Sequence, residues 1–131
     1  MIKPIKQLQS YLKKKNWGAI IVPRSDEYLG EYIAPYAERL KWISGFSGSA
    51  GIAIILKKKA AIFTDGRYTF QIRREVNNKD FSIHNINHFD NWIKKNLKNN
   101  STLAIDPWLF SKKKIDRIIK VLNGKKINIY F

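Results

Sequence analysis

Residues 38–71 read ERLKWISGFSGSAGIAIILKKKAAIFTDGRYTFQ, and this stretch decides how the chain is organised. Gly45, Gly48 and Gly51 fall within seven residues of mostly small side chains. Glycine permits positive φ and close backbone approach, so this part predicts a shaped loop. Two apolar runs follow, and residues 64–68 (TDGRY) then read as a strand end, a turn and a helix start. We expect a ligand or partner to meet the protein here.

The two apolar runs, Ile52–Leu56 and Ala60–Phe63, are joined by three lysines, 57–59. A connection of three residues is too short for a parallel crossover, so the runs should pair as an antiparallel hairpin. Asp65 then occupies the N-cap position of a helix expected over about residues 67–76, since its carboxylate can accept a hydrogen bond from a free backbone N–H.

Apolar periodicity predicts alternating helices and strands along the rest of the chain. Upstream we expect a helix over 2–15, a buried central strand over 19–22, irregular or short helical structure over 27–37 and one or two helical turns over 38–44. Downstream we expect a strand over 81–83, a helix after Asn87, a strand over 103–105, a helix between the Ser111 cap and Gly124, and a strand over 127–131. The predicted fold class is α/β, with a mixed β-sheet and helices on both faces.

The composition is that of one globular domain. The chain has 131 residues, a hydrophobic fraction of 44%, and 4 Trp, 6 Tyr and 7 Phe, which suffice for a real core. Among the aromatics, Trp42 and Phe46 are expected as core or interface anchors. No apolar run reaches membrane-spanning length, and the first residues lack the apolar core of a secretory signal. The absence of cysteine excludes disulfides, thiolate metal sites and cysteine nucleophiles, and we expect a cytoplasmic protein.

The formal net charge of +15 is spread along the sequence. Residues 1–37 carry 6 basic and 3 acidic side chains, residues 38–76 carry 8 and 3, and residues 77–131 carry 11 and 4. Lysine greatly outnumbers arginine, so planar side chains that bind phosphate in bidentate fashion are scarce. This pattern favours solvated lysines, and we do not expect specific nucleic-acid binding.

Motifs of the common enzyme classes are missing from the sequence. There is no phosphate-binding glycine motif, no nucleophile elbow and no H-E-x-x-H. The two histidines, His84 and His88, have no third histidine and no close carboxylate pair beside them, so a zinc site is not expected and both should lie on the surface or at a sheet edge. The chain is a poor candidate for a complete active site.

Four charged residues remain near the glycine-rich loop. In a purely structural interpretation Asp26 forms a turn, Asp65 caps a helix and Arg39 pairs with one of them. In a functional interpretation Arg67, at a helix start, offers its fork of N–H donors to a carboxylate or carbonyl of a ligand. The residue pattern alone favours the structural interpretation, because a surface arginine usually has no specific role.

ERLKWISGFSGSAG followed by AAIFTDGRYTFQ closely resembles the N-terminal, creatinase-like domain of aminopeptidase P, the Xaa-Pro aminopeptidase family. The upstream segment VPRSDEYLGEYIAP, residues 22–35, is similar to a family segment with an aspartate and then a Glu-Tyr pair, here Glu31-Tyr32. The likeness is clear over residues 19–76, and the second half is compatible through Asp106-Pro107. Three ordered motifs at the right spacing are far more specific than one.

The resemblance implies that residues 1–131 are a single creatinase-like N-terminal domain. In such proteins it precedes a second similar domain and a catalytic "pita-bread" domain, and the latter is absent from this chain. That domain holds two divalent metal ions, commonly manganese, through Asp, Asp, His, Glu and Glu, and removes N-terminal residues that precede proline. None of these ligands lies in the 131 residues, so the resemblance implies no cofactor and no activity for this chain by itself.

The resemblance also implies a role. The domain helps to form the substrate cleft and the subunit contacts, and the arginine of Asp-Gly-Arg-Tyr, here Arg67, contacts the substrate. The implied partners are a peptide with proline at its second position, the C-terminal domains of the same polypeptide and, in a homodimer, a second copy. No membrane partner is implied.

Two alternatives stay open at the level of sequence. Related prolidases and creatinases share this N-terminal fold, and the metal ligands encoded beyond Phe131 would separate them from aminopeptidase P. A free-standing basic module for RNA or anionic surfaces is the other alternative. It rests on the net charge of +15 and predicts binding that falls steeply with salt.

Overall fold

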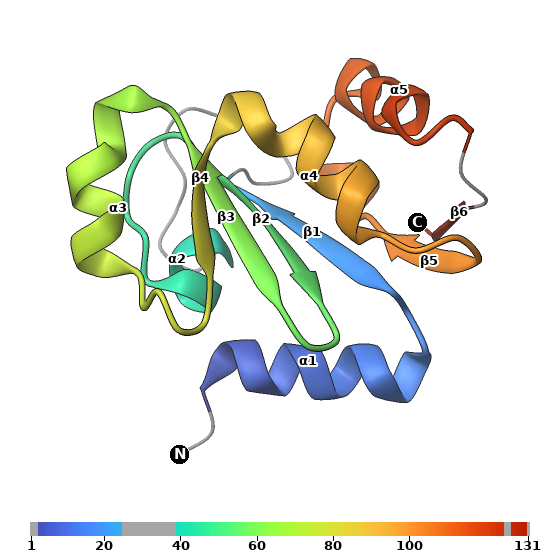
Figure 1. Ribbon diagram of the computed structural model, residues 1–131, viewed down its shortest axis with the longest axis horizontal. Helices are drawn as coiled ribbons and strands as arrows, with labels where there is room; N and C mark the ends of the chain where they lie inside the picture. Colours follow the sequence, from blue (N-terminus) through green and yellow to red (C-terminus); the bar gives the residue numbers. More distant parts are fainter. Residues whose placement is uncertain (1–2, 25–38, 125–126, 131) are drawn as a thin grey trace.

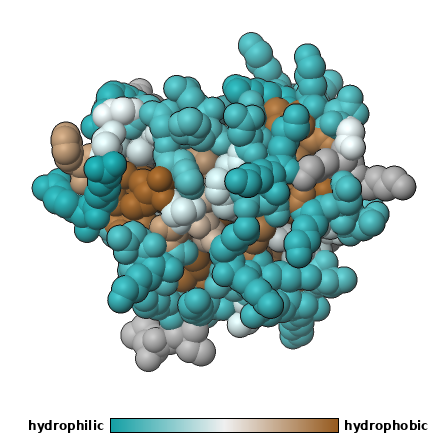
Figure 2. All heavy atoms as spheres, in the orientation of Figure 1, coloured by the Kyte–Doolittle hydropathy of each residue, from teal (hydrophilic) through white to brown (hydrophobic). Residues whose placement is uncertain are grey.

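The structure is a computed structural model that describes residues 3–24, 39–124 and 127–130 (Figure 1). The predicted irregular segment 27–37, Asp26 and the Glu31-Tyr32 pair lie outside the described residues. Hydrophilic side chains cover most of the face seen in Figure 2, with smaller hydrophobic areas between them. Every buried side-chain nitrogen or oxygen in the described part has a hydrogen-bond partner.

Six strands form one sheet in the order β4-β3-β2-β1-β5-β6. The strands are β1 (Ala19–Pro23), β2 (Ile52–Leu56), β3 (Ala60–Thr64), β4 (Ser82–Asn85), β5 (Ser101–Ala104) and β6 (Ile127–Tyr130). Of these six, β2 alone runs against its neighbours, and β2 and β3 pair as the predicted antiparallel hairpin. The pairs β1–β5, β3–β4 and β5–β6 are parallel, so the expected mixed sheet is confirmed.

Helices connect the strands. Within the described residues they are α1 (Pro4–Lys15), α2 (Arg39–Ser44), α3 (Thr69–Glu75), α4 (Phe89–Asn96) and α5 (Lys112–Val121), with three short 3-10 helices, η2 (Gly66–Tyr68), η3 (Ile86–His88) and η4 (Pro107–Leu109). Pro4 suits the first turn of α1 because that position needs no backbone donor, and Asn16 ends α1 in the left-handed conformation. None of the helices in the described ranges is long and apolar enough to cross a bilayer.

Two hydrophobic cores lie on opposite faces of the sheet. Alternate residues of the strands point to each face, as strand geometry requires: in β2, Ala53 and Ile55 belong to one core and Ile54 to the other. Residues of α1, α2 and α3 pack on the first face and residues of α4 and α5 on the second. The expected helices on both faces are therefore confirmed.

The structure corrects one predicted helix start. The helix expected over 67–76 begins as η2, and α3 starts only at Thr69. The helix expected after Asn87 is confirmed as α4, which begins at Phe89. The 3-10 turn η3 precedes it, and the Asn85 side chain caps η3 by accepting a hydrogen bond from the Asn87 N–H. Ser111 caps α5 as predicted.

Candidate functional site

Most of the candidate functional residues in the described part of the chain lie at one edge of the sheet. The strands other than β2 end at this edge and β2 begins there, because it alone runs in the opposite direction. Arg24 follows β1, Asp65 follows β3 and the glycine-rich loop (residues 45–51) precedes β2. The carboxyl ends of parallel strands are where open α/β sheets bind ligands. We call this side the carboxyl edge.

The glycine-rich loop is shaped as the sequence predicts. Gly45 has a φ of +85°, a conformation that residues with a Cβ rarely adopt. Gly48 and Gly51 lie against the ring of Phe46, and a Cβ on Gly48 would come within 2.2 Å of the Phe46 Cζ atom. Phe46 is only 1% exposed and is a core anchor, as expected. Trp42, in contrast, is 58% exposed and is not a core residue.

Hydrogen bonds tie the glycine-rich loop to α3. The Ser47 backbone N–H donates to the Glu75 carboxylate at 2.9 Å, and the Ser47 hydroxyl bonds both carboxylate oxygens at 3.0 and 2.8 Å. Gln71 also donates to Glu75, at 3.2 Å. Desolvation opposes the charge on Glu75, but the donors from Ser47 and Gln71 outweigh it, so the pKa of Glu75 lies below its usual value.

Arg67 is held by Asp65, two residues before it. Its Nε donates to both carboxylate oxygens at 3.1 Å, and its Nη2 donates to Oδ2 at 2.8 Å. Asp65 also accepts from the Arg67 backbone N–H at 3.0 Å, so the predicted N-cap is confirmed. The side-chain hydrogen bond with Arg67 lowers the pKa of Asp65 and raises the pKa of Arg67. Both groups are therefore charged over the whole neutral range.

The guanidinium of Arg67 keeps donors for a further partner. A guanidinium has five N–H donors, and the bonds to Asp65 use the Nε donor and one of the two on Nη2, which leaves about three. The Arg67 side chain is 67% exposed and lies 5.1 Å from the centroid of the Tyr68 ring. The site thus presents a preoriented cation to solvent.

Tyr68 links Arg67 to the glycine-rich loop. Its hydroxyl is hydrogen-bonded to the Ser49 hydroxyl, and its ring packs edge-on against Phe46 at 5.8 Å between centroids. The bond with Ser49 lowers the pKa of the Tyr68 phenol. The orientation of Arg67 therefore depends on the glycine-rich loop, because Arg67 and the loop residues Phe46 and Ser49 all contact Tyr68.

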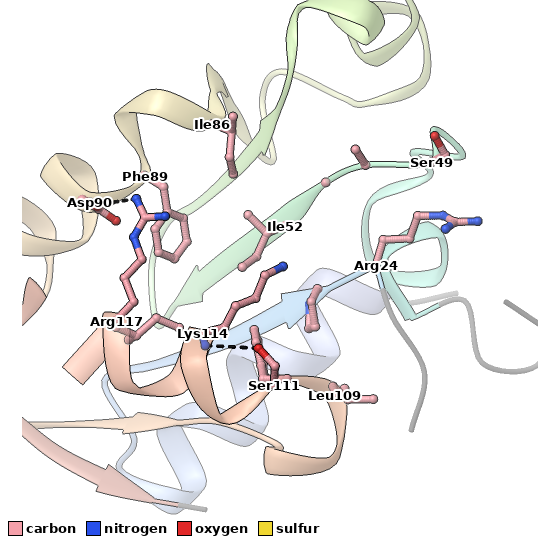
Figure 3. A pocket seen from close by; sticks show the side chains of 15 residues that line it. Arg24, Ser49, Ile52, Ile86, Phe89, Asp90, Leu109, Ser111, Lys114 and Arg117 are labelled. Atoms are coloured by element: carbon pink, nitrogen blue, oxygen red, sulfur yellow. Dashed lines mark hydrogen bonds and ion pairs between the residues drawn. The ribbon is translucent and has the colours of Figure 1, made fainter. Parts of the chain in front are cut away.

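A pocket of about 520 Å³ opens beside this group at the carboxyl edge (Figure 3). Its lining includes apolar side chains of β1, β2, η3, α4, η4 and α5 and also Ser49, whose hydroxyl is bonded to Tyr68. Arg117 and Asp90 form an ion pair of 3.1 Å on one wall, and Figure 3 shows the Lys114 side chain extending toward Ile52. The sequence did not reveal this pocket, because its walls come from segments as distant as residues 23–24 and 109–118.

The four charged residues singled out in the sequence are only partly brought together. Asp65 and Arg67 form the ion pair described above. Arg39 is the first residue of α2, and Asp26 lies outside the described residues. The partner predicted for Arg39, Asp65 or Asp26, thus stays a prediction.

His84 and His88 lie at the predicted sheet edge and surface. His84 belongs to the edge strand β4, and its ring stacks on Phe63 at 5.3 Å between centroids. Burial and then the nearby His88 lower the pKa of His84, so it stays neutral at pH 7. Within the described part of the chain, no three His, Asp or Glu side chains come together as metal ligands. The described residues therefore do not fit a two-metal centre.

The fold and the motifs at the carboxyl edge match a known family. The model of the creatinase/prolidase N-terminal domain matches residues 4–129. The chain belongs to this family. Xaa-Pro aminopeptidase 2 of Rattus norvegicus is 40% identical in an alignment 109 positions long, which covers 79% of this chain and 16% of that protein. Xaa-Pro aminopeptidase 1 of Dictyostelium discoideum is 35% identical in an alignment 134 positions long, gaps included, which covers 98% of this chain and 21% of that protein.

Solved structures agree with this creatinase/prolidase N-terminal domain. The X-prolyl aminopeptidase of Caenorhabditis elegans, a cytosolic enzyme with a di-nuclear active site, superimposes with a TM-score of 0.79 at 25% identity over 86% of this chain and 19% of that one. The N-terminal domain of the cytoplasmic peptidase PepQ from Mycobacterium tuberculosis H37Rv shares the fold, with a TM-score of 0.71 at 18% identity over 96% of this chain and 89% of that one. The chain spans about a fifth of the curated relatives named above.

Proposed function

We propose that this chain is the non-catalytic N-terminal domain of a metal-dependent Xaa-Pro aminopeptidase of the cytoplasm, and that residues 1–131 form one domain. The domain helps to form the substrate cleft and subunit contacts. A separate catalytic domain, with two divalent metal ions that we propose to be manganese, removes residues that precede proline. The identity to Xaa-Pro aminopeptidases over most of the chain supports this proposal.

Arg67 is the residue that we propose to contact the peptide. The observation that carries this is its geometry: Asp65 fixes one side of the guanidinium, and about three N–H donors stay exposed. A fixed fork loses little conformational entropy on binding, which suits it to a carbonyl or carboxylate of a peptide. The pocket beside Ser49 lies on the same edge and offers apolar surface for neighbouring parts of a substrate.

In the proposed enzyme, residues of this chain perform no step of hydrolysis. In the proposed enzyme the metal ions supply the activated water, and their ligands belong to the catalytic domain. The role of Arg67 and its surroundings is to bind and orient. A change at Arg67 should therefore weaken substrate binding without abolishing the chemical step.

The test is Arg67→Ala in the full-length parent enzyme. A hydrogen bond to a charged group is worth about 1.5–3 kcal/mol, so kcat/KM on Xaa-Pro peptides should fall about 10- to 100-fold, largely through KM. Arg67→Lys, which keeps the charge but loses the fork, should recover only part of this loss.

Arg73→Ala is the matched control, because Arg73 is an exposed arginine of α3. It should leave kcat/KM within about twofold of wild type. Unchanged kcat/KM in Arg67→Ala would rule out the proposed contact, and equal losses in both variants would show a general effect of charge.

A further inference from the structure

Folding gathers lysines that are spread along the sequence onto the edge of the sheet opposite the carboxyl edge. The last turn of α1, the β2–β3 turn and the end of α4 meet there (Figure 1). Lys57 Nζ donates to Asn16 Oδ1 at 2.8 Å, Lys59 Nζ donates to Asn96 Oδ1, and Gln9 donates to the Leu56 carbonyl at 3.1 Å. These contacts connect segments that are about 40 residues apart in sequence.

We call this surface the lysine edge. It comprises Lys13, Lys14, Lys15, Lys57, Lys58, Lys59, Lys95 and Lys98, which are exposed except for the half-buried Lys57. The segments 13–16, 56–60 and 94–100 contain no Asp or Glu. Lys57 and Lys59 donate to the neutral amides of Asn16 and Asn96, so these hydrogen bonds hold the ammonium groups in place without neutralising them.

A structural role accounts for only part of this charge. Lysines in the last turns of α1 and α4 stabilise the carbonyl ends of these helices. Each helix end is equivalent to a charge of only about −0.5, so two ends offset about one of the lysine charges. The β2–β3 turn contains no helix end, so the charges of its lysines are not offset in this way. A large positive excess therefore remains on the lysine edge.

An exposed aromatic ring adjoins the lysine edge. Tyr11 is 45% exposed, and the Lys15 ammonium lies 5.7 Å from its ring centroid. Trp17 braces the ring edge-on, at 5.6 Å between centroids and 75° between planes. A basic surface beside a braced aromatic ring is the arrangement on which single-stranded nucleic acids bind, with phosphates on the cations and a base stacked on the ring.

We propose that the lysine edge binds single-stranded nucleic acid through its phosphate backbone, without sequence specificity. Lysine is a point charge and lacks the fork that reads base edges, which accounts for the absence of specificity. A membrane surface fits less well. The other large exposed hydrophobic side chains in the described residues, Trp42, Phe70, Ile86 and Ile119, belong to α2, α3, η3 and α5 and not to the three segments of the lysine edge.

This surface is separate from the carboxyl edge, so the inference does not depend on the proposed peptidase role. The even spread of charge along the chain gave no reason to expect nucleic-acid binding. Folding brings three of the lysine-rich segments together, which the sequence does not show. The Lys112–Lys114 triplet at the start of α5 lies at the other end of the sheet and provides a matched comparison.

The experiment measures fluorescence anisotropy of a labelled single-stranded RNA of about 12 nucleotides titrated with the 131-residue chain. With about five phosphate contacts, log Kobs should fall with log salt at a slope of about −3.5, which is about a 100-fold loss between about 50 and 200 mM NaCl. Replacing Lys57, Lys58 and Lys59 by Ser should reduce the slope to about −1.5 and weaken binding more than tenfold at the lower salt.

The control replaces Lys112, Lys113 and Lys114 by Ser, which removes the same charge and should change affinity less than threefold. Replacing Lys13, Lys14 and Lys15 by Ser repeats the test on a second segment, and circular dichroism checks that each variant is folded. An equal loss of RNA affinity in the Lys57–Lys59 and Lys112–Lys114 variants would overturn the proposal, because the affinity would then depend only on the total charge of the chain. Absence of RNA binding at low salt would overturn it as well, as would binding to phosphatidylserine vesicles but not to RNA.

Discussion

At the scale of single residues, the carboxyl edge is organised by side chains that hold other side chains. Asp65 fixes Arg67, Glu75 fixes Ser47, and Ser49 fixes Tyr68. All three contacts are at least partly exposed, so each contributes little to stability by itself. Their effect is to limit the orientations of Arg67 and of the glycine-rich loop.

The Glu75 contact makes a prediction for pH. Its pKa is lower in the folded protein than in the unfolded chain, so its contribution to stability is complete above the unfolded value of about 4.3 and is lost as pH falls through the lower folded value. Glu75→Gln should reduce the free energy of unfolding by about 0.5–1 kcal/mol at neutral pH and by much less near pH 3. Urea denaturation at both pH values measures the difference.

Asp116→Asn is the control for this prediction, because Asp116 is an exposed carboxylate of α5 to which no hydrogen bond or ion pair is assigned in the described structure. It should change the free energy of unfolding by less than about 0.5 kcal/mol at either pH. A Glu75→Gln effect that persists undiminished at low pH would contradict the role given to the carboxylate.

A contact of this site can be predicted from the sequence only where its two residues lie close together along the chain. The Asp65–Arg67 contact is local, and its residues could be singled out from the turn signal at residues 64–68. The Ser47–Glu75 contact spans 28 residues and has no sequence signal, because it exists only after α3 packs against the loop. The sequence also carries no signal for the exposure of Trp42, because this exposure depends on which face of a six-residue helix meets the sheet.

At the scale of elements, the glycine-rich loop depends on the Phe46 ring that it encloses. Gly48→Ala would place a Cβ 2.2 Å from Phe46 Cζ, and the ring is too buried to move freely. We expect a loss of about 1–3 kcal/mol in the free energy of unfolding, as in other overpacked cores. Thermal denaturation followed by circular dichroism measures it.

Gly66→Ala is the matched substitution, because a Cβ at Gly66 meets no atom within 4 Å. It should be neutral or stabilising by up to about 1 kcal/mol, since alanine restricts the unfolded chain more than glycine does. If both alanine variants lost the same stability, the cause would be loss of glycine flexibility in general and not the contact with Phe46.

The elements themselves follow closely from the sequence. The β2–β3 hairpin and the Ser111 cap depend on local spacing and were predicted correctly. The error lies at one helix start, where Asp65 caps a 3-10 turn, η2, before α3. A 3-10 turn forms hydrogen bonds between residues three apart, whereas an α-helix forms them between residues four apart. The apolar periodicity of so few residues does not distinguish these two structures.

At the scale of the whole molecule, we propose that parts of the enzyme outside these 131 residues perform hydrolysis. The described residues bring together no metal-ligand set, and the relatives are about five times longer. The 131-residue chain with added manganese should therefore release no N-terminal residue from a Xaa-Pro peptide above the buffer rate. The full-length parent in the same chromatographic assay is the positive control, and turnover by the 131 residues would place an active site within them.

The three-layer arrangement has a consequence for how the chain assembles. The first 76 residues contain β1, β2 and β3, which are adjacent in the sheet, together with the three helices of one face. The residues after them add β4 to one side of this unit and β5 and β6 to the other, and supply both helices of the second face. During synthesis, half of the molecule thus emerges from the ribosome with its own core before the second half exists.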